Sequence, residues 1–172
     1  MDEVEVVNYD PRWPALFDEE AELLRANLDP SLIVGLEHFG STAVPALSAK
    51  PIIDILIAVR SLADAQASFV EPLRNLDYVY WAENPRKDRM FFVKGMPPFG
   101  SGRSHHVHVT EPHGEMWQRL AFRDYLRAHP EEARAYGQLK RRLASEHPTD
   151  REAYTSAKAA YIETVMRKAI KS

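Results

Sequence analysis

The sequence predicts an α+β fold in which a mixed β-sheet is flanked by helices and followed by a helical C-terminal region. Three observations predict it. Residues 52–59 form an apolar run with strand-like alternation, three shorter strand-like segments follow it, and helical patterning dominates from residue 114 onward. A chain of 172 residues has the length of one domain, so we expect residues 1–172 to form one, with its helical part at about 114–172.

The front of the chain alternates between helix and strand signals. A short extended lead is expected over residues 3–7, and apolar positions at helical spacing then predict a helix over residues 15–28. Residues 32–39 are typical of a strand that leads into the turn Gly40-Ser41, after which Ser41 or Thr42 could cap a helix. That helix has to be short, because Pro51 disfavours a helical conformation at Lys50.

The strand predicted over residues 52–59 contains one charged side chain. Alternation assigns its side chains to two faces, Ile53, Ile55 and Ile57 to one and Asp54, Leu56 and Ala58 to the other. An ionised carboxylate in such a run is costly to bury unless a cation, a hydrogen-bond donor or a metal ion meets it. Asp54 is therefore the first candidate for a functional residue.

The remaining elements complete the sheet and add the helices. Residues 61–76 are typical of an amphipathic helix, and strands are expected over residues 78–81, 89–94 and 105–110. Turn-rich links between these strands favour antiparallel pairing, and the link over residues 95–102 could cover a ligand. Three further helices are predicted over residues 115–128, 131–146 and 151–170.

Composition excludes several classes of site and partner. The chain contains no cysteine, so a metal site would have to use carboxylates, histidines or backbone oxygens. The N-terminal residues lack a signal-peptide pattern, and the longest apolar run is far too short to span a bilayer, which favours a cytoplasmic protein without a membrane partner. A net charge of −3 gives no general attraction to duplex nucleic acid. A small phosphorylated partner would have to be bound by a local cluster of basic groups.

The Gly40-Ser41 turn could hold a phosphate group. Backbone amides and a hydroxyl at a helix N-terminus attract anions, although the same turn could be only a tight connection with a cap. Asp54 follows on the next strand, where its carboxylate could hold a magnesium ion that bridges to phosphate oxygens.

Several segments resemble the GrpB family, which is also described as a family of uncharacterised proteins. They are HFGSTAVPALSAKPIIDI, YDPRWPALFDEE, HHVHV, FRDYLR, LK and YTSAK, which together run along nearly the whole chain. The family is placed in the nucleotidyltransferase-fold superfamily, whose pattern is a Gly-Ser pair followed by two acids on a strand. The resemblance implies a nucleotidyltransferase-like fold, with Gly40 and Ser41 as the pair and Asp54 as the first acid. It also implies Asp54 and Ser41 as catalytic residues of a metal-dependent nucleotidyl or phosphoryl transfer.

The second acid of that superfamily pattern is missing. It would lie two residues after Asp54, where this chain has Leu56. Two-metal catalysis relies on acids that share both ions, so the substitution favours the alternative of a binding or sensor module. One acid could still suffice, because magnesium often uses only one or two protein carboxylates beside phosphates and water.

Two histidines could compensate for the missing acid. His106 and His108 project to the same face of their predicted strand, whereas His105 projects to the other. If that face lies beside Asp54, the three side chains form a two-histidine, one-carboxylate cluster suited to manganese, iron or zinc. Protonated histidines would instead contact phosphate, and the two roles predict opposite pH behaviour.

Basic residues could complete an anion site. Lys50 and Arg103 flank the candidate site in sequence, Arg89 and Lys94 lie on a predicted strand, and Arg123, Tyr154 and Lys158 belong to the closing motifs that could reach back to the cleft. His38 lies just before the turn and could equally be a buried core histidine. The predicted metal ligands are Asp54, His106 and His108, and the predicted phosphate-binding residues are Gly40, Ser41, Thr42, Lys50, Arg103 and Lys158.

These features predict a protein that binds a nucleotide or another phosphorylated small molecule together with a divalent metal ion. The metal is expected to be magnesium or manganese, or zinc if the histidine pair ligates it. The protein could catalyse nucleotidyl or phosphoryl transfer, or it could bind its ligand without turnover. A scaffold protein acting through its helical tail is a third interpretation, supported only by the amphipathic helices.

Overall fold

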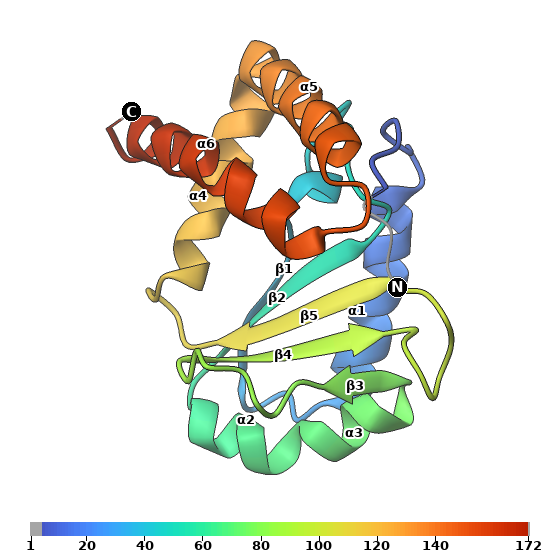
Figure 1. Cartoon of the computed structure of the whole chain (residues 1–172). Coiled ribbons are helices and arrows are strands. Elements are labelled where there is room, and N and C mark those ends of the chain that lie inside the picture. Colours follow the sequence, from blue (N-terminus) through green and yellow to red (C-terminus); the bar gives the residue numbers. More distant parts are fainter. Residues whose placement is uncertain (1–4, 172) are drawn as a thin grey trace.

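A computed structural model describes residues 5–171 and confirms the α+β fold (Figure 1). Its elements follow the order α1 (Trp13–Asn27), β1 (Ile33–Phe39), η1 (Ser41–Ala43), β2 (Ile53–Val59), α2 (Leu62–Ser68), α3 (Val70–Asn75), β3 (Tyr78–Tyr80), β4 (Arg89–Lys94), β5 (His105–Thr110), η2 (Met116–Gln118), α4 (Arg119–Ala128), α5 (Pro130–Glu146) and α6 (Arg151–Lys171). Residues 3 and 4 of the expected extended lead lie outside the described residues, and Val7 forms an antiparallel bridge with Ala49.

The sheet is mixed, with the strand order β1-β2-β5-β4-β3. Pairing is antiparallel between β1 and β2, β5 and β4, and β4 and β3, as expected for the strands joined by turn-rich links. The central pair, β2 and β5, is parallel. Its register sets Asp54 opposite His106 and Leu56 opposite His108, so the candidate residues of two distant segments become neighbours.

One face of the sheet is closed by α1, α2 and α3 (Figure 1). Ile53, Ile55 and Ile57 point to this side, as alternation predicts, and pack with apolar side chains of the three helices. Burying each such side chain fully contributes about 1.5–3 kcal/mol relative to exposure. This layer is the main hydrophobic core of the protein.

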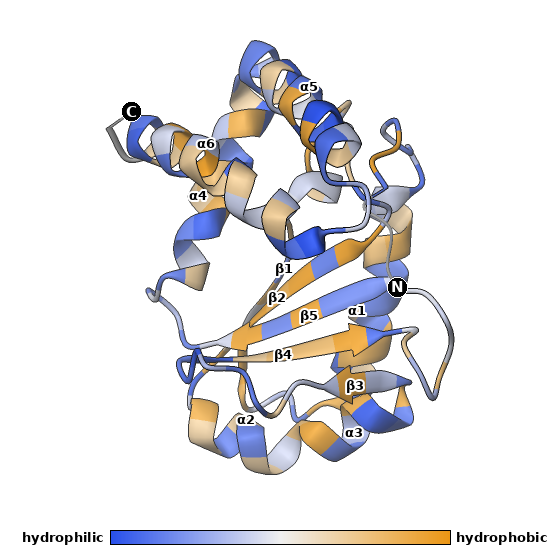
Figure 2. Ribbon diagram, viewed as in Figure 1, coloured by the Kyte–Doolittle hydropathy of each residue, from blue (hydrophilic) through white to orange (hydrophobic). Residues whose placement is uncertain are grey.

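The C-terminal helices pack on the other side, toward β1, β2 and the loop between them (Figure 1). Leu56 packs there with Phe39, Met116 and Leu120, while the loop residues Val44 and Leu47 pack with side chains of α4, α5 and α6. Figure 2 shows hydrophilic segments within the otherwise hydrophobic strand β2 and along β5. The helices therefore meet the sheet where its strands carry polar side chains.

Three predicted helices differ in detail from the structure. The helix expected over residues 61–76 is divided into α2 and α3, because Pro72 lacks the N–H that a continuous helix would use and its ring crowds the carbonyl four residues earlier. The helix expected from residue 115 starts with the 3₁₀ turn η2. The stub after Gly40 is also a single 3₁₀ turn, η1, of three residues.

The link over residues 95–102 is closed at its base. The N–H of Gly102 donates to the carbonyl oxygen of Gly95 at 3.1 Å. Its role as a cover for a ligand stays a prediction. Among the described residues, no helix is both long and apolar enough to cross a membrane.

Candidate functional site

Gly40 makes room for the carboxylate of Asp54. The backbone of Gly40 has φ of 74°, and a Cβ atom added there would lie 2.6 Å from Oδ2 of Asp54. That separation is shorter than any van der Waals contact, so any side chain at this position would displace the carboxylate. The glycine of the predicted Gly-Ser pair thus acts by admitting the acid, in a conformation that other residues rarely adopt.

Asp54, His106 and His108 converge on one point. Oδ1 of Asp54 lies 3.3 Å from Nδ1 of His106 and 3.7 Å from Nε2 of His108. One ligand atom from each residue lies within 4.8 Å of the other two. The parallel pairing of β2 with β5 produces this arrangement, since it sets the three side chains on the same face of adjacent strands.

The protonation states of Asp54 and His108 suit a metal ion. Burial alone would raise the pKa of Asp54, but hydrogen bonds and charge from His106 and His108 hold it well below its ordinary value. Burial lowers the pKa of His108, although the neighbouring carboxylate opposes that shift. An ionised carboxylate and a neutral imidazole are the forms that bind a divalent cation.

Neighbouring side chains hold the two imidazole rings. The ring of Phe91 lies 5.1 Å from that of His106 and 4.7 Å from that of His108, measured between centroids. Nη1 of Arg103 lies 3.4 Å from Nε2 of His106, on the side of the ring that faces away from Asp54. Fixed rings are a requirement for metal ligation, because the ligating nitrogen must point at the ion.

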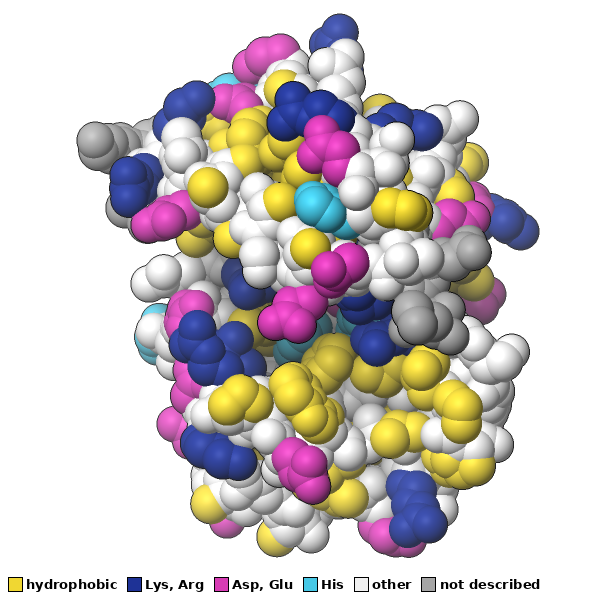
Figure 3. Space-filling model, in the orientation of Figure 1, with side chains coloured by type: hydrophobic (Ala, Val, Ile, Leu, Met, Phe, Trp, Pro, Cys, Tyr) yellow, Lys and Arg dark blue, Asp and Glu magenta, His cyan; other side chains and the backbone are white. Residues whose placement is uncertain are grey.

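A pocket beside the trio contains most of the predicted site residues. It has a volume of about 80 Å³ and is lined by Ser41, Thr42, Ala49, Lys50, Ile52, Asp54, His106, Lys140, Tyr154 and Lys158. A second pocket shares Lys50 and Ile52 with the first and contains Arg103. In the space-filling view, Lys, Arg and His side chains gather in the hollow between the helices and the sheet (Figure 3).

Two features of the Gly-Ser turn differ from the phosphate site expected there. The hydroxyl of Thr42 lies 2.9 Å from Nε2 of His38, so it already has a partner. The turn η1 has only three residues and supplies almost no helix dipole for an anion. Of the two hydroxyl groups in this turn, that of Ser41 is the less buried, and it lies within hydrogen-bond reach of Tyr136.

His38 is a buried core histidine, the second of its two interpretations. Its ring stacks on Phe17 with centroids 4.8 Å apart. Burial lowers its pKa to about 4. The ring is thus neutral at physiological pH.

Three basic residues considered for the site do not line either pocket. Arg123 donates from Nη1 to the carboxylate of Glu37 and to the carbonyl of His38, each at 2.9 Å, and so ties α4 to β1. Lys94 lies on the opposite face of the sheet, and Arg89 is paired with acids near η2. In this structure all three side chains are paired with other groups of the fold.

Lys140 lines the pocket but was not predicted from the sequence. It belongs to α5 and is only 2% exposed. Tyr136, Leu139, Lys140 and Leu143 follow the i, i+3, i+4, i+7 spacing of one helix face. A lysine on an otherwise apolar stripe was thus the signal that could have identified it.

Close packing of α5 brings Lys140 to the pocket. A Cβ atom added to Gly137 would lie 3.4 Å from Cδ1 of Leu47, so the helix backbone lies directly on the loop that follows η1. Tyr154 and Lys158, from the first turns of α6, complete the same wall. Their predicted approach to the cleft is what the structure shows.

The position of the missing acid is occupied by a leucine that packs among apolar side chains. Leu56 is fully buried among Phe39, Met116 and Leu120. A carboxylate there would enter an apolar cluster at a considerable cost. His108, opposite Leu56 in the register, supplies the second polar group next to Asp54 instead.

The chain is similar to bacterial proteins along almost its full length. It is 52% identical to a UPF0157 protein of Pseudomonas aeruginosa over 98% of this chain and 69% of the relative. A crystal structure of the conserved protein GrpB from Enterococcus faecalis superposes with a TM-score of 0.87 at 36% identity, covering 97% of this chain and 98% of the other.

A further similarity is to a longer protein. The chain is 29% identical to a dephospho-CoA kinase of Mycolicibacterium paratuberculosis over 96% of this chain, but it spans only 46% of that protein. The family model described as GrpB protein matches residues 3–168. Because the family model covers residues 3–168 and the E. faecalis GrpB structure matches at a TM-score of 0.87 and 36% identity, the chain belongs to the GrpB family.

Proposed function

We propose that this protein binds a nucleotide or another phosphorylated small molecule together with a divalent metal ion, and that it transfers a nucleotidyl or phosphoryl group. The observation that carries the proposal is the convergence of Asp54, His106 and His108 beside a pocket lined by three lysines. The trio offers ligands to a cation, and the lysines offer charge to phosphate oxygens. Metal and phosphate commonly occur together in this combination.

The donor set of the trio indicates which metal ions fit. Two imidazole nitrogens and one carboxylate oxygen suit manganese, iron or zinc better than magnesium, which prefers oxygen ligands. The separation of the ligand atoms, all within 4.8 Å of one another, allows them to surround one ion. A bound ion would polarise a phosphoryl oxygen and neutralise its charge.

The chain's own residues would position the phosphorylated ligand. Ser41 can donate its hydroxyl hydrogen to a phosphate oxygen, and Lys50 and Lys158 can pair with the charge of the phosphate. Arg103 lines the adjoining pocket, next to His106, where the rest of the ligand would extend. Acceleration of group transfer by such a site comes mostly from positioning and charge stabilisation.

A binding or sensor module is the second candidate function. The buried Leu56 favours it, because the position where two-metal transfer would use a second carboxylate is filled by apolar packing. Such a module would use the same trio and the same pocket, but it would release its ligand unchanged.

The similarity to a protein named dephospho-CoA kinase supports nucleotide or coenzyme chemistry as the setting of this function. Because the chain spans 46% of that relative, the activity named for the whole relative does not pass to this chain by similarity alone.

Calorimetry with manganese tests the proposal. We expect Mn²⁺ to bind the wild-type protein, ATP to bind more tightly in its presence, and Asp54→Asn to abolish both effects. Unchanged Mn²⁺ binding in this variant would overturn the assignment of the trio. Release of pyrophosphate or phosphate from a panel of nucleotides then separates the two candidates, since a module would show binding without release.

A further inference from the structure

Three lysines and one tyrosine from three separate segments meet in the pocket beside Asp54. Lys50 precedes β2, Lys140 belongs to α5, and Tyr154 and Lys158 belong to α6. We call these four residues the lysine pocket. Of these four residues, only Lys50 and Lys158 were expected near a phosphate from the sequence. Lys140 of α5 and Tyr154 of α6 are additional groups that the Gly-Ser turn and the metal trio do not explain.

The ammonium groups of the lysine pocket contact aromatic rings. Nζ of Lys50 and Nζ of Lys158 lie 5.0 Å and 4.9 Å from the centroid of the Tyr154 ring, and Nζ of Lys140 lies 4.7 Å from that of Tyr136. Within residues 5–169, whose side chains the structure describes, these three ammonium groups make no hydrogen bond or ion pair. Cation–π contacts offset only part of the cost of removing an ammonium group from water.

The hydroxyl of Tyr154 is a second, independent sign of a ligand. The side chain is fully buried and lines the pocket, and in the described part of the chain its hydroxyl group has no hydrogen-bond partner. Burial raises the pKa of Tyr154 to about 12, so the group keeps its proton and can donate it. Buried polar groups without a partner are rare in native proteins, and an absent ligand is one explanation for them.

The pocket contains more positive than negative groups. Among residues 5–171, Asp54 is the only carboxylate that lines it, and this carboxylate is already shared with His106 and His108. Burial is the main cause that lowers the pKa of both Lys50 and Lys140, and repulsion from neighbouring cations lowers it further. An anion bound among the lysines would relieve this repulsion.

The donors indicate the chemical class of the anion. Three ammonium groups and a phenolic hydroxyl can donate hydrogen bonds, and Asp54 is the one ionised acceptor that the described residues bring to the pocket. A phosphoryl group accepts at three oxygens and carries up to two charges, so it matches four donors better than a carboxylate does. The metal trio beside the pocket would bind a different phosphoryl group.

We propose that the lysine pocket binds one phosphoryl group without a metal ion, while the trio binds a linked phosphoryl group through its metal. The protein would then select ligands that carry two or more linked phosphoryl groups over monophosphates. Binding at the lysine pocket is independent of the function proposed above, whereas the selection of linked groups rests on it.

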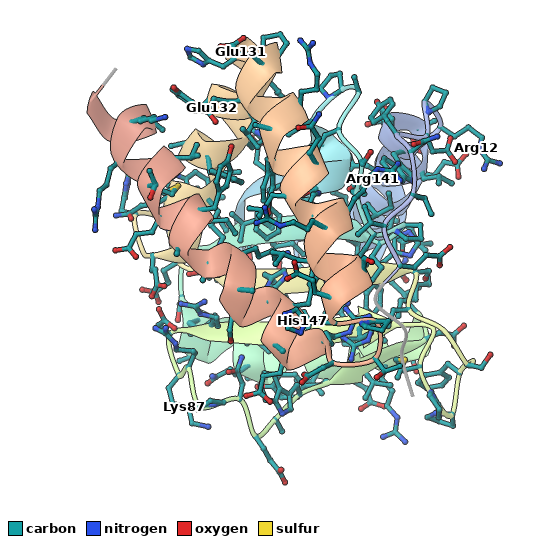
Figure 4. All side chains as sticks on the ribbon, turned by 45° about the horizontal axis from the view of Figure 1, so that its top comes forward. Arg12, Lys87, Glu131, Glu132, Arg141 and His147 are labelled. Carbon is teal, nitrogen blue, oxygen red and sulfur yellow. The ribbon has the colours of Figure 1, made fainter. Side chains whose placement is uncertain are left out.

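Calorimetry with inorganic pyrophosphate in the presence of EDTA tests the lysine pocket. We expect pyrophosphate and orthophosphate both to bind the wild-type protein in EDTA, and a preference of at least tenfold for pyrophosphate to develop only when Mn²⁺ replaces EDTA. Lys140→Met should weaken pyrophosphate binding at least tenfold, and Tyr154→Phe, which removes only the hydroxyl, should weaken it several-fold. Lys87→Met is the matched control, because Lys87 is exposed and lies at the edge of the molecule away from α5 and α6 (Figure 4).

The results separate this proposal from the proposed function. Asp54→Asn should bind pyrophosphate in EDTA as tightly as the wild-type protein or more tightly, even though it no longer binds Mn²⁺. Failure of the wild-type protein to bind Mn²⁺, with pyrophosphate binding intact, would overturn the metal site alone. The lysine pocket would be wrong if pyrophosphate did not bind in EDTA, or if Lys140→Met and Tyr154→Phe, both folded by circular dichroism, bound it as the wild type does. Equal affinity for orthophosphate and pyrophosphate in the presence of Mn²⁺ would overturn the selection of linked groups.

Discussion

The two faces of the sheet both bury charged side chains, but they differ in how these side chains are paired. On the face covered by α1, Nζ of Lys94 donates to the two carboxylate oxygens of Glu20 at 2.7 and 3.1 Å, and the hydroxyl of Tyr78 donates to the same carboxylate at 3.1 Å. On the face covered by the C-terminal helices, three lysines contact aromatic rings and, within residues 5–169, form no ion pair.

This difference distinguishes a structural charge network from a ligand site. Glu20 and Lys94 satisfy each other, so their positions are explained by the fold alone. The lysine pocket gains no comparable stabilisation from its own residues, so a cluster of this kind favours a function that uses it. The contrast can be tested by removing charges on each side in turn.

The largest effect is expected on the satisfied face. Glu20→Gln should lower the free energy of unfolding by about 3 kcal/mol, because it leaves Lys94 with a partly buried charge and no carboxylate. Urea denaturation of the purified variant measures this change. A loss below about 0.5 kcal/mol would mean that the network contributes no more than a surface ion pair.

Gly40→Ala tests the contact between the turn and the acid. The new Cβ atom would collide with the carboxylate of Asp54, and the residue would hold a positive φ that alanine disfavours. We expect a loss of about 1–3 kcal/mol in the free energy of unfolding, together with loss of Mn²⁺ binding. Retained Mn²⁺ affinity in a folded variant would show that the carboxylate does not need its present position.

The pH dependence of stability sharpens the comparison further. Burial lowers the pKa of Lys158 from 10.5 to about 8, while Asp54 opposes this shift and Arg119 and Arg151 add to it. Between pH 8 and 10.5 the unfolded chain binds the proton more strongly than the folded one, so this lysine makes stability rise with pH across that window.

Below pH 8 both states carry the proton, and the cost of burying the charge is present in full. The gain between pH 7.5 and 10 should be about 2 kcal/mol larger for the wild type than for Lys158→Met. Urea midpoints and slopes for both proteins at the two pH values measure it. Parallel curves would show that the ammonium group is solvated.

Lys140→Met gives the smallest expected effect on stability, but one of opposite sign to that of Glu20→Gln. Replacing an unpaired buried charge by an apolar side chain of similar length should raise the free energy of unfolding by about 1 kcal/mol. Destabilisation of the variant would contradict the view that this charge serves a ligand and not the fold. Thermal unfolding of the two proteins side by side is sufficient to decide the sign.

The sequence predicts the fold well because its signals are local. Strand alternation predicts that Asp54 and the isoleucines of β2 point to opposite faces of the sheet. The turn-rich links predict the antiparallel pairing of β3 with β4 and of β4 with β5. The break at Pro72 is also local, but the amphipathic pattern on both sides of it favours one continuous helix.

The site could be predicted only in part, because it depends on contacts between distant segments. The histidine pair lies beside Asp54 only through the parallel pairing of β2 with β5, which no local pattern specifies. The same limit applies to Arg123, whose link to Glu37 on β1 depends on how α4 packs. Lys140 carried a usable signal, since a lysine on an apolar helix stripe has to be buried or to disrupt the packing.

A crystal structure of the protein soaked with Mn²⁺ and a nucleoside triphosphate is the most direct test of the metal trio and the lysine pocket. We expect an anomalous peak at roughly 2.0–2.3 Å from Oδ1 of Asp54, Nδ1 of His106 and Nε2 of His108, with a phosphoryl group of the nucleotide among Lys50, Lys140 and Lys158. The trio and the lysine pocket would both be wrong if manganese and nucleotide bound elsewhere and the pocket contained only water.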